Sequence, residues 1–197
     1  MAKKVKIKKT LVEQILSKAG IPHQGIQINA LEGELPQGYE RNQIFKTLVE
    51  QILTKAGIDH TGIQINALEG ELPSEYDRTH IFKTLALLGD KTGPIIGIVP
   101  ITEHLAEKKL AKVSGNKKVS MIPQKDLEKT TGYIHGANNP VGIRQKHNYP
   151  IFIDQTALDL DKMIVSAGEV GQSIIIRPQD LASFVKADFA DLLEENN

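Results

Sequence analysis

Apolar residues recur at helical spacing in two stretches of the N-terminal half. In residues 10–20, TLVEQILSKAG, Leu11, Ile15 and Ala19 follow one another at i, i+4 and i+8, which is typical of a helix with one apolar face. The threonine that opens this stretch and the glycine that closes it are common start and stop signals. The same pattern recurs in residues 47–57, so the sequence predicts two helices of the same kind.

The two predicted helices belong to a longer tandem repeat. Residues 10–46 and 47–83 are each 37 residues long, adjoin without a gap and are identical at 29 positions. Each copy also contains GIQIN, whose alternation predicts a short strand, and then ALEGELP, whose Gly and Pro predict a loop. Solenoids need about three or more units to bury a continuous core. The sequence therefore predicts a duplication inside an ordinary domain, with one copy extra.

From residue 83 onwards, apolar residues alternate or run together as they do in strands. KTLALLG and PIIGIVP, separated by the turn DKTG, predict a hairpin. Helices are predicted over 102–115, with Thr102 as the cap, over 123–132 and over 178–187. Short strands are predicted at 117–123, 150–154, 162–168 and 173–178, and a turn-rich loop at 133–143. Because strands and helices mix without strict βαβ alternation, we expect a mixed α/β fold with helices packed on the sheet.

The composition narrows the possible chemistry. The chain has 24 basic and 24 acidic residues, 40% hydrophobic residues and no cysteine. This is ordinary soluble composition, and it excludes a cysteine nucleophile, disulfides and thiolate metal sites. The start, MAKKVKIKK, is not followed by an apolar run, and no stretch reaches the length of a membrane span. We therefore expect a cytoplasmic protein without a membrane segment, in which the lysine-rich stretches are solvated surface or meet phosphates.

Common catalytic signatures do not occur in the chain. There is no GxSxG, HExxH or GxxxxGK[ST] motif, and the six histidines show no metal-ligand spacing. We therefore expect neither a metal nor a cofactor. The most informative segment is TTGYIHGANNPVGIRQ, residues 130–145, where three glycines and Pro140 make a loop that exposes backbone N–H groups. Such a loop can hold an anion or a carbonyl oxygen, although most Gly/Pro loops are only turns.

Several motifs occur in a specific order along the chain. They are FKTL, KKVSMIP, TTGYIHGANNPVG, FID with a following AL, IVSAG with a following Gly, and PQDL. In this order they resemble the YbaK/ProX-type family of trans-editing aminoacyl-tRNA deacylases, which is related to the editing domain inserted in some prolyl-tRNA synthetases. The resemblance implies a mixed, barrel-like β-sheet with packed helices. It assigns residues 47–197 to the editing domain and leaves 1–46 as a basic N-terminus plus the extra repeat copy.

The resemblance also implies a site. The family's catalytic lysine and glycine match Lys83 and Gly136, and its serine in the V-S-[AG]-G turn matches Ser166. The expected substrate-binding residues are Tyr133, Asn139, Pro140, Gly142 and Ser166. The implied reaction is hydrolysis of the ester of a mischarged tRNA, typically cysteinyl-tRNA(Pro), with prolyl-tRNA synthetase as a possible partner. The chain has Ala137 and Asn139 where relatives often have a second Gly and a Ser or Thr, which leaves the choice of amino acid open.

The residues themselves agree with this reaction class. An aminoacyl ester is already activated, so it needs positioning and a stabiliser of the oxyanion more than a protein nucleophile. Lys83 would hold a phosphate or the ribose, the Gly136 N–H would hold the developing oxyanion, and a cysteinyl substrate would supply its own thiol. Two alternatives stay open at this point. The chain could bind tRNA or a nucleotide without turnover, or it could edit another amino acid such as alanine.

The motif IFKTL ends both repeat copies, so the sequence offers two candidate lysines. Lys83 is followed by a predicted strand and Lys46 by a predicted helix. A lysine at the head of a helix does not share the backbone geometry of a lysine on a strand, so Lys83 is the candidate. The helix and strand upstream are ambiguous because the apolar faces of the two copies match. We expect the second copy to dock, since it is tethered closer to the sheet.

Overall fold

The computed structural model describes residues 47–65 and 76–195. The first repeat copy, with its predicted helix at 10–20 and Lys46, lies outside the described residues, as does the predicted loop of the second copy. The proposed assignment of residues 1–46 as a separate segment therefore stays a prediction. In the part of the chain that the structure describes, no helix is long and apolar enough to cross a membrane.

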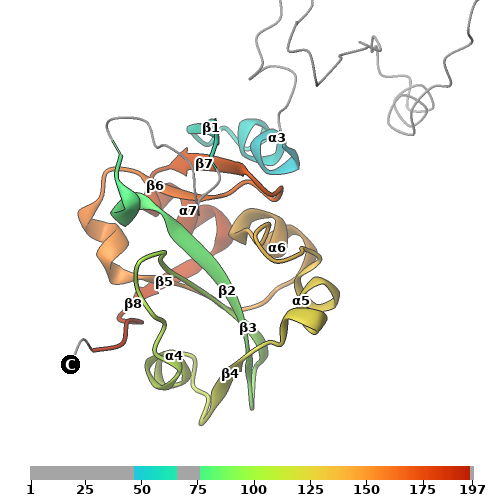
Figure 1. Ribbon diagram of the computed structural model, residues 1–197, viewed down its shortest axis with the longest axis vertical. Helices are drawn as coiled ribbons and strands as arrows, with labels where there is room; N and C mark the ends of the chain where they lie inside the picture. Colours follow the sequence, from blue (N-terminus) through green and yellow to red (C-terminus); the bar gives the residue numbers. More distant parts are fainter. Residues whose placement is uncertain (1–46, 66–75, 196–197) are drawn as a thin grey trace, which may run out of the picture. The chain divides into compact units, whose positions relative to one another are not determined.

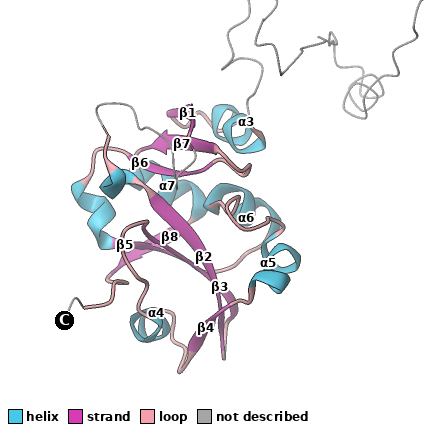
Figure 2. Ribbon diagram, viewed as in Figure 1, coloured by secondary structure: helices cyan, strands magenta, loops and turns pink. Residues whose placement is uncertain are grey.

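The described strands form two sheets, with helices packed around them (Figures 1 and 2). One sheet has the order β1–β7–β6 and the other the order β4–β2–β3–β5–β8. The strands are β1 (His60–Gln64), β2 (Phe82–Gly89), β3 (Gly93–Pro100), β4 (Val119–Met121), β5 (Ile151–Asp154), β6 (Met163–Ser166), β7 (Gln172–Ile176) and β8 (Ala187–Ala190). The helices are α3 (Leu48–Lys55), α4 (Glu107–Val113), α5 (Gln124–Thr131), α6 (Pro140–Lys146) and α7 (Pro178–Val185), with 3₁₀ turns at Arg78–His80 and Gln155–Asp159.

The five-stranded sheet is mixed, as the sequence predicts. β2 and β3 form an antiparallel hairpin around the predicted turn, whereas β3 pairs with β5, and β5 with β8, in parallel. An isolated parallel bridge between Ile81 and Ile164 joins the start of β2 to β6 of the other sheet. The mixed α/β class is therefore confirmed. The described strands form two bridged sheets, and they do not show a closed barrel.

The main apolar core lies where the two sheets face each other, together with α3, α6 and α7. It contains Phe82 of β2, Val165 of β6, Val141 of α6 and Leu181 of α7. A second apolar cluster covers the opposite face of the five-stranded sheet, where Leu110 of α4 packs with residues of β2, β3 and β5. The five-stranded sheet is thus buried on both faces, which explains the continuous apolar runs of its central strands.

The second repeat copy docks on the domain, as expected. Thr47 caps α3 by accepting a hydrogen bond from the Glu50 N–H, and the Glu50 side chain accepts one from the Thr47 N–H, which completes a capping box. Val49 and Leu53 are buried in the main core. The strand that follows, β1, pairs antiparallel with β7. Helix, cap and strand therefore all arise from the copy adjacent to β2.

Three boundaries differ from the sequence prediction. The segment expected to be a turn-rich loop contains α6, although Asn139 and Pro140 are typical residues for a helix cap and the first helical position. Helix α4 begins at Glu107 after Ala106, not at Thr102, because residues 101–105 turn away from the end of β3. Strand β8 was not predicted at all, because its weakly patterned residues become a strand only by pairing with the buried β5.

Candidate functional site

The predicted site loop is held in place by its own side chains. Helix α5 ends at Gly132 with φ of 78°, and α6 begins after Asn139, whose Oδ1 accepts a 2.6 Å hydrogen bond from the Gly142 N–H. The Asn139 Nδ2 donates a 3.3 Å hydrogen bond to the main-chain oxygen of Ala137. Asn139 is fully buried, and Pro140 and Gly142 are buried as well. These three predicted site residues therefore shape the loop from beneath.

Tyr133 links this loop to the turn between β6 and β7. A β-carbon on Gly142 would overlap the Tyr133 hydroxyl and would lie 2.6 Å from the ring Cζ, so only a glycine admits the ring in this position. A β-carbon on Gly168 would lie 3.1 Å from Asn139 Nδ2 and 3.5 Å from Tyr133 Cε1. The loop and the turn that follows Ser166 are therefore in direct contact, although about thirty residues separate them in the chain.

Gly136 lies at the exposed tip of the loop. It adopts a φ of 84°, a conformation that L side chains rarely adopt. Within residues 47–65 and 76–195, its N–H donates no hydrogen bond to main-chain or side-chain oxygens. A β-carbon there would meet only Val170, at 3.8 Å, on the same β6–β7 turn. The exposed Gly136 therefore has an N–H without a partner among the described residues, beside that turn, and an unpaired N–H is the kind of donor an oxyanion needs.

Lys83 lies on β2, opposite Val99 of β3. Its amine donates a 2.6 Å hydrogen bond to the main-chain oxygen of Glu103, and the Ile101 oxygen lies 3.4 Å away. Partial burial lowers the pKa of the Lys83 amine, and the nearby negative charge of Glu103 acts in the opposite direction. The amine is thus a half-buried cation that holds the turn after β3, and with both of these oxygens bound it keeps one further N–H for another acceptor.

Ser166 is the last residue of β6. An isolated parallel bridge between Ile81 and Ile164 joins the start of β2 to β6, two residues before Lys83 on one side and two before Ser166 on the other. The Ser166 hydroxyl accepts a 3.2 Å hydrogen bond from the Gly168 N–H. The hydroxyl therefore supports the turn that Tyr133 and Asn139 contact, in addition to any contact it makes with a substrate.

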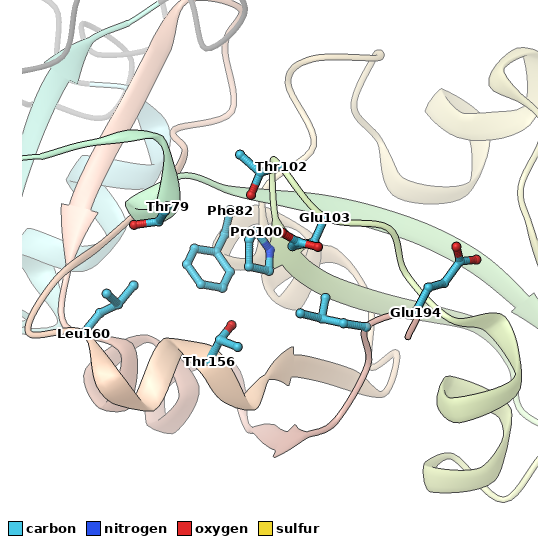
Figure 3. Close-up of a pocket in the computed structure, with 9 residues that line it drawn as sticks. Thr79, Phe82, Pro100, Thr102, Glu103, Thr156, Leu160 and Glu194 are labelled. Carbon is cyan, nitrogen blue, oxygen red and sulfur yellow. The ribbon is translucent and has the colours of Figure 1, made fainter. Parts of the chain in front are cut away.

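A pocket of about 350 Å³ opens beside the turn that Lys83 holds (Figure 3). In Figure 3 the Phe82 ring points into the pocket between Thr79, Leu160 and Thr156. The other lining residues are Pro100, Thr102, Glu103, Leu193 and Glu194. None of the residues predicted as site residues lines it. The sequence did not indicate this pocket because four separate segments contribute two or three residues each. The nearest available signal was Phe82, the first residue of the FKTL motif.

One further polar group near Lys83 has no partner. The Thr84 hydroxyl is buried and makes no hydrogen bond within the described residues. An unsatisfied buried hydroxyl costs about 1–3 kcal/mol, so it is unusual in the middle of a central strand. The same portion of the chain contains no group of three or more His, Asp or Glu side chains arranged to hold a metal ion.

Fold and site together define a small mixed α/β domain in which the exposed loop contacts the β6–β7 turn, while the Lys83 amine holds the turn after β3. The sequence model of the aminoacyl-tRNA editing domain family matches residues 72–184, which is more than half of the chain. The chain therefore belongs to this family. The match includes Lys83, Gly136 and Ser166, and it begins within the second repeat copy.

Individual relatives agree with this family. The chain is 42% identical over 108 residues to the "Putative Cys-tRNA(Pro)/Cys-tRNA(Cys) deacylase EbsC" of Enterococcus faecalis, a match that covers 55% of this chain and 65% of that protein. A solved structure of "a putative trans-editing enzyme for prolyl tRNA synthetase" superposes with a TM-score of 0.62 at 19% identity, over 75% of this chain and 95% of the other. A hypothetical protein of known structure gives a TM-score of 0.64 at 20% identity, over 74% and 99% of the two chains. At these identities the structures show that the fold is shared.

Proposed function

We propose that this protein is an aminoacyl-tRNA deacylase that hydrolyses the ester of mischarged tRNA, with cysteinyl-tRNA(Pro) as its main substrate. The observation that carries the proposal is the editing-domain match over residues 72–184 together with the 42% identity to a protein named as a Cys-tRNA(Pro)/Cys-tRNA(Cys) deacylase. The cytoplasm, where tRNA is charged, is the expected location. Prolyl-tRNA synthetase is the expected partner, because it makes the mischarged tRNA that such an enzyme would receive.

In the proposed reaction, the substrate supplies the nucleophile. The cysteinyl thiol loses its proton and attacks its own acyl carbon, the bond to the ribose oxygen breaks, and that oxygen takes up a proton. Water then opens the cyclic thioester and releases free cysteine. Gly136 is exposed and its N–H has no partner within the described residues, so it is our candidate donor to the oxyanion.

Lys83 and the loop would position the tRNA end. The Lys83 amine is a cation on a flexible stem, and it can exchange the oxygens of Ile101 and Glu103 for a phosphate or ribose oxygen. Tyr133 lies against the β6–β7 turn at Gly168, and the Ser166 hydroxyl supports the same turn, so both are candidates to contact the terminal adenosine. The buried residues Asn139, Pro140 and Gly142 would act by fixing the loop that carries Gly136.

A second candidate is a module that binds tRNA without turnover. It is favoured by one observation, namely that the Lys83 amine is already engaged by two main-chain oxygens. A third candidate function is editing of Ala-tRNA(Pro). It would use the same site, but the substrate would have no thiol to act as the nucleophile.

A deacylation assay separates these functions. The full chain is mixed with Cys-tRNA(Pro), Cys-tRNA(Cys), Ala-tRNA(Pro) and Pro-tRNA(Pro), and release of each amino acid is followed. We expect rapid release of cysteine, slow release of alanine and no release of proline, and we expect Lys83→Ala to abolish cysteine release. Alanine release without cysteine release would instead identify the alanyl editor. Binding without any release would identify the module, and unchanged activity of Lys83→Ala would refute the role of this lysine.

A further inference from the structure

Beyond the reaction itself, the structure contains a surface next to the site that combines lysines with aromatic rings. Charge is unevenly distributed along the chain: residues 91–129 contain eight Lys and four Asp or Glu, whereas residues 147–195 contain three Lys or Arg and nine Asp or Glu. The basic part includes α5, which ends at the site loop. Two of these eight lysines, Lys125 and Lys129, lie on α5 itself, so a chain of zero net charge can still present a local basic surface there.

Two lysines of α5 point away from the core. Leu127 and Thr131 define the buried face of this helix, and at 100° per residue Lys125 and Lys129 lie on the opposite face. Both are exposed, and neither makes a hydrogen bond or ion pair within the described segments. Since residues at i and i+4 lie about 5–6 Å apart on a helix, they form a short row. The acidic residues of α5, Asp126 and Glu128, flank the row on its two sides.

The row continues onto α6 and reaches the site. The Lys146 amine donates a 3.1 Å hydrogen bond to the Gly132 oxygen at the end of α5, and it lies 4.0 Å from the centre of the Tyr133 ring. Tyr133 in turn lies against Gly142 and the Gly168 turn. This contact joins the C-terminal end of α6 to the C-terminal end of α5 (Figure 1). The lysine row thus leads from the outer face of α5 to the loop that carries Gly136.

Beside this row, a stacked pair of rings is attached to the same helix end. The rings of His147 and Tyr149 are stacked, with centres 4.6 Å apart and planes at 5°. The Tyr149 hydroxyl donates a 3.1 Å hydrogen bond to the Thr130 oxygen of α5. Basic side chains next to aromatic rings are the combination that binds single-stranded nucleic acid, because the cations meet phosphates and the rings stack on bases.

We infer that Lys125, Lys129 and Lys146, with Tyr133, form a track that binds the sugar–phosphate backbone of the single-stranded 3′ end of tRNA and guides it to the Gly136 loop. The inference rests on the proposed function, since it takes tRNA as the ligand of this site. It adds the surface that holds the strand outside the reaction centre, which the family match does not assign.

The chain provides a matched control on another helix. Lys108 and Lys112 of α4 have the same spacing and are also exposed and without hydrogen bonds or ion pairs in the described chain. They lie on a helix that covers the opposite face of the five-stranded sheet, since Leu110 packs in the second apolar cluster and Leu127 of α5 in the main core. The double variants Lys125→Gln/Lys129→Gln and Lys108→Gln/Lys112→Gln therefore remove equal charge from equivalent positions.

The test measures equilibrium binding of uncharged tRNA to the full chain at several salt concentrations. Two lost contacts to single-stranded phosphates should reduce the slope of log K against log salt by about 1.4, with affinity weakened about fivefold or more at low salt. The α4 variant should change the slope and the affinity by no more than about a third as much as the α5 variant does. With tRNA that lacks its single-stranded 3′ end, the difference between wild type and the α5 variant should disappear.

Equal effects of the α4 and α5 variants would overturn the track, and so would a difference that persists with truncated tRNA. Because the tRNA used as the probe carries no amino acid, the binding result does not depend on hydrolysis. A chain that releases cysteine but shows equal effects keeps the proposed function and loses the track. If the protein binds tRNA through α5 but releases no amino acid, the track is kept and the proposed function is lost.

Discussion

The Lys83 amine donates a 2.6 Å hydrogen bond to the main-chain oxygen of Glu103, so the candidate catalytic lysine and the wall of the adjacent pocket are directly connected. Residues Pro100 to Glu103 supply three of the groups that line this pocket (Figure 3). Displacing the amine towards a substrate would therefore release the turn after β3. The position of the Lys83 amine and the shape of this pocket wall are therefore linked through one hydrogen bond.

The first prediction concerns the titration of Lys83. Burial lowers its pKa and the Glu103 charge partly opposes this, so its resonance should titrate below the ordinary lysine range in NMR spectra of protein with isotope-labelled lysine. Glu103→Gln should lower the pKa further. Between the folded and unfolded pKa values the unfolded chain binds more protons, so the contribution of Lys83 to stability increases as pH rises. An unchanged or raised pKa in Glu103→Gln would contradict the assigned cause.

The second prediction concerns the unpaired Thr84 hydroxyl. Thr84→Val keeps the shape of the side chain and removes a buried group without a partner, so the free energy of unfolding should rise by about 1 kcal/mol. The matched control is Thr131→Val. The buried Thr131 hydroxyl accepts from the Tyr133 N–H and donates its one proton either to Asn138 Oδ1, at 2.8 Å, or to the Leu127 oxygen, at 3.0 Å, so its loss should cost about 1–3 kcal/mol. Urea unfolding measures both, and a destabilised Thr84→Val would show that this hydroxyl has a partner in solution.

The third prediction tests the contact between Gly142 and Tyr133. Alanine is favoured over glycine in a helix by about 1 kcal/mol, but here its β-carbon would overlap the Tyr133 hydroxyl. Gly142→Ala should therefore destabilise the wild-type protein. In the Tyr133→Ala background the same change should cost less or become stabilising, and a double-mutant cycle from urea unfolding gives the coupling. Equal cost in both backgrounds would mean that the ring does not occupy this position.

The fourth prediction distinguishes the two repeat copies. Leu53 is fully buried in the main core, so Leu53→Ala should lower the free energy of unfolding by about 2–5 kcal/mol. Leu16 is the equivalent residue of the first copy, and Leu16→Ala should have little effect. A small effect of Leu53→Ala, with a large effect when Leu16→Ala is added, would show that the first copy can replace the second.

Deletion of residues 10–46 tests the same point directly. Because the second copy supplies the helix, its cap and the strand that pairs with β7, the shortened chain should fold with nearly the same free energy of unfolding and should retain deacylase activity. A deletion variant that fails to fold would show that the first copy contributes contacts to the domain.

Local signals account for the elements that the sequence predicted well. Helix α3 has its apolar stripe, its threonine cap and its capping-box glutamate within four residues, and the β2–β3 hairpin has alternating or continuous apolar strands around a turn with Gly93 at a positive φ. The α5 helix likewise ends at its predicted glycine. In each case the information lies within about one turn of the residues it organises, so it can be found without the fold.

The elements that the sequence missed depend on distant partners. Helix α6 has typical start signals, but the glycines around them favoured the prediction of a loop. The helix is stabilised because Val141 and Ile143 are buried in the main core. Strand β8 exists because β5 offers a parallel edge. The pocket beside Lys83 could not be predicted from the sequence, because its lining residues come from four separate segments. No local pattern encodes such surfaces, since they form only when the segments meet.

The sequence by itself determined the duplication, the mixed α/β class and the order of motifs that indicates an editing domain, and it favours Lys83 over Lys46 as the candidate lysine, because each motif and each predicted element is a local pattern of residues. Only the tertiary structure decided that Asn139, Pro140 and Gly142 are buried supports of the Gly136 loop, that Lys83 is held by the turn after β3, and that Lys146 and Tyr133 join α5 to the site. The physical reason is that burial and hydrogen bonding at these positions depend on segments about ten to more than forty residues away, brought together by the packing of two sheets around one apolar core.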